Sequence, residues 1–264
     1  MAEGSLTYKQ RPAWPVQPAG RIALLDVDPD LAGRATSAQL AADRAKLTTP
    51  VYRLGPGPMP LPERGPDSQL GYLVLKGLLI YEVSVCGRGT AELLGPGDIV
   101  RPWTREAAGS LLSESQWTVL EQVLLADLGS IDIAGLVNSR EILEGLVGRA
   151  ADRGEAVALQ RSIAAHVRVD VRVLAYLWHL ADRFGVVVPG AVRLNVPLTH
   201  AVLARLVGAR RPTVTTALQR LMQLGYLRRE GRAFVLMGDA VSVSELESRS
   251  PARDFALPEP DPVL

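Results

Sequence analysis

The stretch Pro197–Gly225, PLTHAVLARLVGARRPTVTTALQRLMQLG, has the pattern of two short helices joined by a tight turn. Thr199 suits the N-cap of the first helix, because its hydroxyl can accept a hydrogen bond from a free backbone N–H. Gly208 allows a turn where a side chain would clash, and Pro212 suits the first turn of the second helix. With Gly225 ending that helix, the stretch predicts a helix-turn-helix.

Each of the two helices has one apolar side and one polar side. The residues expected to be buried are Leu203, Ala204, Leu206 and Val207 in the first helix, and Val214, Ala217, Leu218 and Leu221 in the second. The residues left facing outward on the second helix are Arg211, Pro212, Thr215, Thr216 and Gln219. The second helix of such a unit enters the major groove of DNA, where arginine can pair with guanine and threonine can contact a phosphate or a thymine methyl group.

A basic hairpin is expected directly after these helices. Two strand-like segments flank the turn Glu230-Gly231-Arg232, which predicts a wing whose Arg228, Arg229 and Arg232 lie against phosphates. Residues 190–237 hold eight arginines and one acid, whereas residues 1–189 carry a net charge of −2 and residues 238–264 one of −4. This charge pattern is typical of a polyanion-binding module, although charge alone would fit a solvated basic face equally well.

The first half of the 264-residue chain has a different texture. Short apolar runs with β-branched and aromatic residues recur about every ten residues, at Leu70–Leu75, Gly77–Val85, Thr90–Leu94, Ile99–Val100 and Trp117–Leu128. Turns such as Gly95–Asp98 separate them, which predicts an antiparallel roll or barrel. Residues 1–20 contain three prolines and are expected to form a loose arm.

From about residue 138 the apolar period becomes helical. The stripe of the predicted helix over residues 139–165 consists of Leu143, Leu146, Ala150, Val157 and Ala164, and a second helix is predicted over Val169–Phe184. Because a long helix with such a stripe is not stable alone, it must pack on the roll or pair with a copy of itself, and we expect both.

Composition and motifs exclude several classes of protein. The lone cysteine, Cys86, allows no disulfide within the chain and no cysteine-ligated cluster or zinc site, and the three histidines lack metal-ligand spacing. The N-terminus does not have the pattern of a signal peptide, and no run of 18 apolar residues exists, so we expect a cytoplasmic protein without membrane association. No P-loop, G-x-S-x-G motif or convincing carboxylate pair is present, so we expect neither an enzyme nor a cofactor.

The pattern LTHAVLARLVGARRPTVTTALQRLMQLGYLRREGRAFVL resembles the C-terminal domain of the Crp/Fnr (cyclic-AMP receptor protein-like) transcription regulators. These regulators typically show a threonine-capped helix, V-G-x-x-R-x-T-V, then leucines and an arginine-rich wing. GYLVLKGLLIYEV resembles the start of their β-roll, and LLGPGDIV resembles its L-G-x-G-D turn, so the resemblance covers about residues 70 to 240. It implies an α+β fold with an N-terminal antiparallel, cyclic-nucleotide-binding-like β-roll, a long dimerisation helix and a C-terminal winged helix-turn-helix.

By this match Arg211 takes the position that reads guanine, and Thr213 and Thr215 take positions that contact phosphate. Pro212 stands where a glutamate often reads cytosine, and Thr216 stands where a second arginine is usual, so the operator is expected to differ from the family's commonest half-site. The full set of candidate DNA-binding residues is Thr199, Arg210, Arg211, Thr213, Thr215, Thr216, Gln219, Arg220, Arg228, Arg229 and Arg232.

The resemblance also bears on a ligand. Members of the family that bind cyclic nucleotides carry a Gly-Glu pair for the ribose and an arginine before Ser/Thr-Ala for the cyclic phosphate, which must be paired when it is buried. Neither feature is present in Ile99–Glu106 or in Ser113–Trp117, so we expect no cyclic AMP binding of this kind. Arg101 and Arg105 are weak candidates for holding another anion, and Trp103 and Trp117 could line a pocket or belong to the core.

We expect a sensor-like roll with its arm in residues 1–137, a dimerisation helix in 138–166, the winged helix-turn-helix in 167–240 and an acidic, disordered tail in 241–264. The expected function is transcription regulation by a homodimer on an inverted-repeat operator, with double-stranded DNA as partner and RNA polymerase as a candidate further partner. The alternative is a sensor module whose helix-turn-helix contacts a protein, and salt-dependent binding to duplex DNA distinguishes the two. The sequence leaves open the operator, activation against repression, any small molecule and the role of the tail.

Overall fold

The protein is described here by a computed structural model, which places residues 14, 18–33, 44, 46–60, 70–102, 113–131 and 140–248. The chain divides into two compact units. The first comprises Met1–Ala165 with Thr199–Arg210, and the second comprises His166–Leu198 with Arg211–Leu264.

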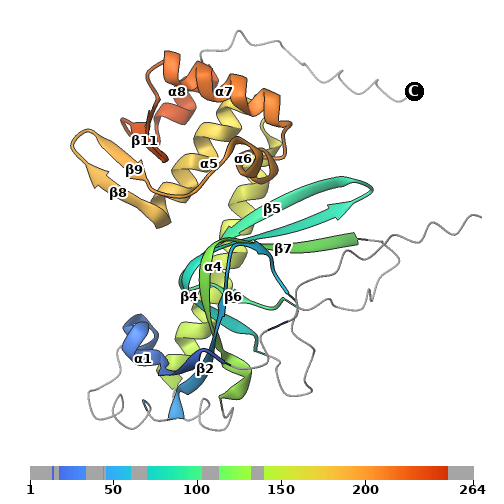
Figure 1. Ribbon diagram of the computed structural model, residues 1–264. Coiled ribbons are helices and arrows are strands. Elements are labelled where there is room, and N and C mark those ends of the chain that lie inside the picture. The colour runs from blue at the N-terminus through green and yellow to red at the C-terminus, as the bar shows by residue number, and fades with distance from the viewer. Residues whose placement is uncertain are drawn as a thin grey trace, which may run out of the picture. The chain divides into compact units, whose positions relative to one another are not determined.

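The first unit is built on an antiparallel sheet, as predicted. Its strands run in the order β1-β2-β7-β4-β5, with β3 paired to β7 and β6 paired to β4 (Figure 1). The bounds are β1 Gly20–Ala23, β2 Thr48–Leu54, β3 Gly57–Pro58, β4 Tyr72–Val85, β5 Arg88–Leu94, β6 Ile99–Val100 and β7 Ser113–Asp127. The described residues also form three short helical segments, α1 Leu24–Val27 and the 3-10 turn η1 Pro29–Ala32 between β1 and β2, and the 3-10 turn η2 Leu128–Ser130 after β7.

Strand β4 corrects one expectation from the sequence. The two apolar runs on either side of Lys76 belong to one continuous strand, whose pairing with β7 is irregular between Val74 and Leu79. Gly77 has a φ of +86°, and a Cβ there would collide with the backbone carbonyl of Gln122. The glycine therefore forms a bulge inside a strand, where the sequence pattern indicated a boundary between two strands.

Two apolar cores lie in the described part of the roll, and Trp14 packs against one of them. One core includes Leu54, Tyr72, Leu94 and Trp117, and Trp14 packs against it. The ring of Trp14 lies 5.3 Å from that of Tyr52 and 5.1 Å from that of Tyr72, centroid to centroid. The expectation of a loose arm is therefore wrong at Trp14, because packing the large apolar indole against the core is more favourable than leaving it in water.

Helix α4, Arg140–Ala165, has two apolar faces, whereas the sequence indicated one stripe. Ile142, Leu146 and Ile163 are buried, and the first two belong to the second core of the roll, together with Leu31 of η1. Leu143, Val147 and Val157 are 39%, 60% and 36% exposed. Of the predicted stripe, Leu146 therefore packs on the roll, whereas Leu143 and Val157 stay partly exposed.

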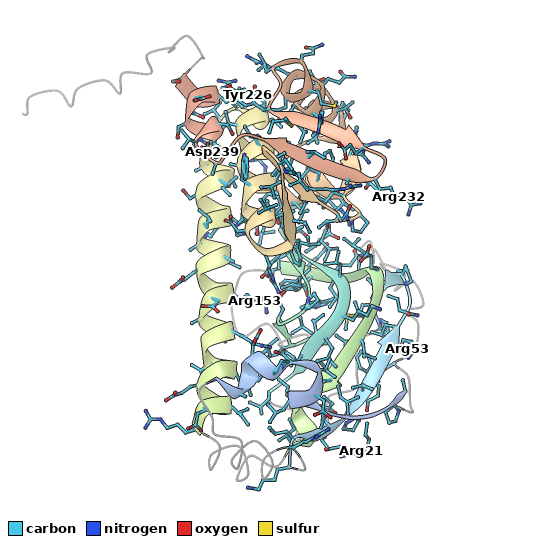
Figure 2. All side chains as sticks on the ribbon, turned by 90° about the vertical axis from the view of Figure 1, so that its left-hand side faces the viewer. Arg21, Arg53, Arg153, Tyr226, Arg232 and Asp239 are labelled. Atoms are coloured by element: carbon cyan, nitrogen blue, oxygen red, sulfur yellow. The ribbon has the colours of Figure 1, made fainter. Side chains whose placement is uncertain are left out.

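Two arginines of α4 anchor it to the roll. Arg149 makes a paired contact with Asp28, with Nη2 2.6 Å from Oδ1. Arg153, which Figure 2 labels, binds both carboxylate oxygens of Glu92 at 2.8 Å and donates a hydrogen bond to the carbonyl oxygen of Ile99 at 3.0 Å. Both pairs are largely screened from water, so they fix the rotation of the helix on the roll.

The second unit combines a four-stranded sheet with three helices. Its strand order is β10-β11-β9-β8 (Figure 1). The bounds are α5 Val169–Phe184, β8 Gly185–Val188, β9 Ala191–Leu194, α7 Arg211–Gln223, β10 Leu227–Glu230, β11 Ala233–Met237 and α8 Ser242–Ser248. The limits of α5 and the wing hairpin β10–β11 were predicted, whereas the hairpin β8–β9 was not.

Helix α8 corrects the expectation of a disordered tail for Ser242–Ser248. Leu246 is fully buried, and the hydroxyl of Ser242 accepts a hydrogen bond from the indole N–H of Trp178 on α5 at 3.2 Å. Burial of one leucine and this polar contact stabilise a short helix that its acidic composition did not predict. Residues 249–264 lie outside the described part of the chain.

Candidate nucleic-acid interface

Helix α7 presents the polar face that the sequence predicted. Val214, Ala217, Leu218 and Leu221 are buried, and α7 packs on α5. The exposed residues of the helix are Arg211, Pro212, Thr213, Thr216, Gln219 and Arg220, with Met222 and Gln223 in its last turn, while Thr215 is half-buried. The outward residues thus form one continuous polar surface along the helix, and its N-terminal turn carries Arg211.

Two threonines on this surface bond back to the helix. The hydroxyl of Thr215 donates to the carbonyl oxygen of Arg211 at 3.1 Å, and that of Thr216 donates to the carbonyl oxygen of Pro212 at 3.3 Å. The hydroxyl protons are thus used within the helix, and what each threonine offers outward is a methyl group and an acceptor oxygen. The methyl group can pack against a thymine methyl group, and the oxygen can accept a hydrogen bond from an exocyclic amine on a base edge.

Helix α6, His200–Leu206, belongs to the first unit and begins as predicted. The hydroxyl oxygen of Thr199 accepts a hydrogen bond from the backbone N–H of Val202 at 3.1 Å, which confirms the N-cap. Gly208 has a φ of +62°, a conformation that favours glycine in the turn after this helix. Arg205 forms an ion pair with Glu82 of β4 at 2.6 Å, and Arg210 is exposed.

The wing carries its arginines in three different settings. Arg229 stacks its guanidinium 4.6 Å from the centroid of the Phe234 ring and donates to the carbonyl oxygen of Gly231 at 3.2 Å. Arg232 is exposed at the turn between β10 and β11 (Figure 2). Arg228 lies 3.2 Å from a carboxylate oxygen of Glu230. Of the three, Arg232 is the one most freely presented to a polyanion.

A second arginine contacts the same carboxylate and was not among the predicted site residues. Arg193 of β9 lies 3.8 Å from the other oxygen of Glu230. Arg193 precedes the helices by sequence, and only the pairing of β9 with β11 brings it beside the wing. The position of Arg193 in the basic segment 190–237 could have marked it as a candidate DNA-binding residue, but strand β9, which places it beside the wing, was not predicted.

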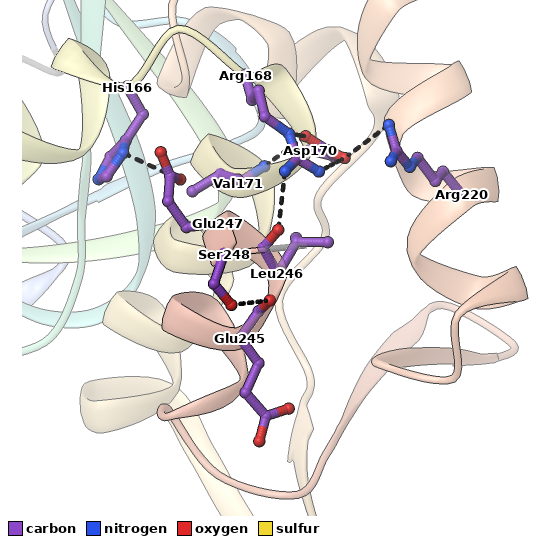
Figure 3. Close-up of polar contacts among 9 residues, drawn as sticks. All are labelled: His166, Arg168, Asp170, Val171, Arg220, Glu245, Leu246, Glu247 and Ser248. Carbon is purple, nitrogen blue, oxygen red and sulfur yellow. Dashed lines mark hydrogen bonds and ion pairs between the residues drawn. The ribbon is translucent and has the colours of Figure 1, made fainter. Parts of the chain in front are cut away.

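A buried carboxylate ties α7 to its neighbours (Figure 3). Asp170 of α5 is 6% exposed, accepts from Nη2 of Arg168 at 2.7 Å and lies 3.3 Å from Nη1 of Arg220. Burial alone would raise the pKa of Asp170, but hydrogen bonds from Arg168 and the nearby positive charges outweigh it and lower that pKa. Arg168 also donates to the carbonyl oxygen of Leu246 at 2.8 Å, which holds α8 in place.

The weak ligand candidates are placed only in part. Arg101 is exposed directly after β6, whereas Arg105 and Trp103 lie outside the described residues. Trp117 is 7% exposed and its ring lies 4.3 Å from that of Tyr81, so it belongs to the core of the roll. Within the described ranges no three histidine, cysteine or acidic side chains gather as a metal site would require, and no helix has the length and apolar character of a membrane span.

A DNA-reading helix followed by a basic hairpin defines the class of winged helix-turn-helix regulators. Residues 171–239 match the Crp-like helix-turn-helix domain family. The CRP-like cAMP-activated global transcriptional regulator of Mycobacterium tuberculosis is 27% identical over 192 residues, which cover 72% of this chain and 76% of that protein. Residues 171–239 thus form a Crp-like helix-turn-helix domain, and the chain is similar to transcription regulators of the Crp/Fnr type rather than to enzymes.

Solved structures with lower identity share the fold. A cyclic nucleotide-binding domain containing protein from Listeria monocytogenes EGD-e matches with a TM-score of 0.59 at 16% identity, over 79% of this chain and 96% of that one. The c-di-GMP responsive global regulator CLP of Xanthomonas campestris matches with a TM-score of 0.54 at 20% identity, over 77% and 100%. These likenesses confirm the predicted combination of an antiparallel β-roll with a C-terminal helix-turn-helix.

Proposed function

We propose that the chain binds an inverted-repeat operator as a homodimer and does so without cyclic AMP. The observation that carries the proposal is the polar face of α7. Arg211, Thr213 and Thr216 are exposed on its N-terminal half, while the opposite side is fixed in the core of its unit. A side chain on such a rigid, outward-facing helix can reach base edges in the major groove, and the wing arginines can reach phosphates.

The exposed face of α4 is the proposed dimer interface. Leu143, Val147, Gly154 and Val157 follow one another at spacings of four, seven and three residues, and the small Ala150 lies between them. This is the alternation of a seam between two helices, in which small residues let the backbones approach. A two-fold dimer would present two recognition helices about 34 Å apart, one turn of DNA, and its symmetry would require the two half-sites to form an inverted repeat.

The absence of cyclic AMP from the mechanism is proposed on chemical grounds. A cyclic phosphate in the roll needs a cation beside it, and β7 begins Ser113-Glu114-Ser115-Gln116-Trp117, without an arginine. The two arginines by which α4 contacts the roll already have carboxylate partners, Arg149 with Asp28 and Arg153 with Glu92. The relative from Mycobacterium tuberculosis is named as activated by cAMP, so this chain would differ from it in its signal.

The remaining parts of the proposal follow from the class of protein. We assign DNA contact to Thr199, Arg210, Arg211, Thr213, Thr215, Thr216, Gln219, Arg220, Arg228, Arg229 and Arg232. The sensor-like roll would take residues 1–137, the dimerisation helix 138–166 and the DNA-binding domain 167–240. The protein would act in the cytoplasm, with RNA polymerase as a further partner on the promoter.

Binding to duplex DNA at graded salt concentrations tests the function. A genome-wide footprint would first supply the operator, and a scrambled duplex of equal length is its control. We expect the logarithm of the binding constant to fall linearly with the logarithm of salt, by about 0.9 per phosphate contacted, on both duplexes. Salt-independent binding, or binding to neither duplex, would favour a helix-turn-helix that contacts a protein.

A further inference from the structure

Strands β10 and β9, which lie on either side of β11, bring one acid and two arginines together. Arg228 pairs with Val235 across β10 and β11, and Val235 pairs with Arg193 across β11 and β9, so both arginines project from the same face. Glu230 is two residues beyond Arg228 on β10 and shares that face. Its carboxylate lies 3.2 Å from Nη2 of Arg228 and 3.8 Å from Nη1 of Arg193.

This three-residue cluster is weak enough to be displaced. The side chains of Arg193 and Arg228 are 44% and 60% exposed, and that of Glu230 is 43% exposed. Solvent-exposed pairs of this kind contribute little to folding, because water screens them and two long side chains must be ordered. A phosphate offers the same anionic oxygens as a carboxylate, so DNA can replace Glu230 as the partner of either arginine.

Glu230 is also the only acid of the basic segment 190–237. The other wing arginines do not depend on it, because Arg229 stacks on Phe234 and Arg232 lies at the turn. Its negative charge therefore acts on Arg193 and Arg228 selectively, and it stands on the element that approaches the DNA backbone in the proposed function.

We infer that Glu230 is an internal stand-in for a DNA phosphate, which holds Arg193 and Arg228 in the DNA-free protein and thereby weakens binding to every duplex. The inference rests on the proposed function. Glu230 is a positioning residue in this scheme, because it acts through the two arginines and through repulsion of phosphates rather than by contact with a base. Its effect is consequently independent of DNA sequence and sensitive to salt.

Three variants of the full-length chain separate the charge of Glu230 from its shape. Glu230→Gln keeps the shape and removes the charge, and we expect it to bind both operator and scrambled duplex about three- to tenfold more tightly at low salt. Glu230→Asp keeps the charge and should stay within about twofold of the wild type. Glu245→Gln on α8 makes the same change in net charge at an exposed position and should leave DNA binding unchanged.

A salt titration and a double-arginine variant complete the test. Glu230→Gln should steepen the salt dependence by about one to two phosphates, and this gain should disappear when Arg193 and Arg228 are also changed to glutamine. The inference is overturned if Glu230→Gln binds like Glu245→Gln, or if Glu230→Asp tightens binding as Glu230→Gln does. Thermal melts confirm that each variant is folded. If the wild-type protein shows no salt-dependent DNA binding, the proposed function is wrong. That result differs from the one in which the wild type binds DNA and Glu230→Gln binds it equally well, which overturns the inference alone.

Discussion

Arg220 of α7 lies 3.3 Å from the carboxylate of Asp170 on α5, so the helix proposed to read DNA is joined by an ion pair to the helix that it packs on (Figure 3). The same carboxylate binds Arg168, which in turn holds the carbonyl oxygen of Leu246 on α8. One buried acid therefore connects three helices of the second unit. Arg220, which we assign to DNA contact, has this structural role as well.

Replacement of Asp170 by asparagine is expected to lower the free energy of unfolding by about 2 kcal/mol at neutral pH, because two guanidinium groups lose their charged partner. Because the pKa of Asp170 is lowered in the fold, its contribution is fully present above the ordinary aspartate pKa and is lost as the pH falls through the lowered value. The difference in unfolding free energy between wild type and variant should therefore disappear in acid. Denaturant unfolding at several pH values measures it.

The control for this prediction is Asp182→Asn, which changes an exposed aspartate on the same helix. We expect its unfolding free energy to stay within about 0.5 kcal/mol of the wild type. A gap for Asp170→Asn that stays constant down to the lowest pH would show that the ion pairs are not the source of the stability.

Arg211→Ala and Arg232→Ala should weaken DNA binding in different ways. Arg211 lies in the first turn of α7, so its loss should cost about 1–3 kcal/mol on the operator and little on scrambled duplex. Arg232 lies at the turn of the wing, so its loss should weaken both duplexes and reduce the salt slope by about one unit. If Arg211→Ala weakened both duplexes equally while Arg232→Ala affected the operator alone, the wing would be the reading element.

Val147→Glu should break the proposed dimer. Val147 is 60% exposed on the same face of α4 as Leu143 and Val157, and a buried, unpaired carboxylate in a helix seam is strongly unfavourable. Sedimentation at micromolar concentration should show a dimer for the wild type and a monomer for this variant. Leu159→Glu is the matched control, since Leu159 is 50% exposed on another side of the same helix and should leave the dimer intact.

Cyclic AMP should bind weakly or not at all. The roll lacks an arginine at the start of β7 to pair with a cyclic phosphate, and an unpaired phosphate is costly to bury. Isothermal calorimetry on the full-length protein is the measurement, followed by DNA binding in the presence and absence of the nucleotide. Micromolar affinity together with a change in DNA affinity would refute this reading of the roll, because coupling between two sites must appear in both.

Local patterns in the sequence were enough for the helix-turn-helix. The cap at Thr199, the turn at Gly208 and the buried side of α7 all depend on residues close in the chain, and the structure confirms each of them. The wing hairpin was predictable for the same reason, since its turn and flanking segments are contiguous.

Features that depend on distant residues were missed or misread. Asp170 meets Arg220 across 50 positions of sequence, and Arg193 reaches Glu230 only because β9 pairs with β11. Gly77 looked like a boundary, because a sequence pattern cannot distinguish a turn from a bulge that β7 accommodates. The sequence indicated one apolar stripe on α4, because the spacing of residues along the chain does not distinguish one broad apolar face from two neighbouring faces about 100° apart around the helix.

The two faces of α4 have a mechanical consequence. The helix is a single rigid element of 26 residues, with one side fixed to the roll by Arg149 and Arg153 and another side exposed. Turning such a helix by about 20° about its own axis carries every side-chain tip through roughly 2 Å, given a radius of about 5–6 Å. Any rearrangement of the roll that reorients the two arginines thus shifts the exposed face along its whole length at once, and in the proposed dimer the packing between two copies would change with the state of the roll.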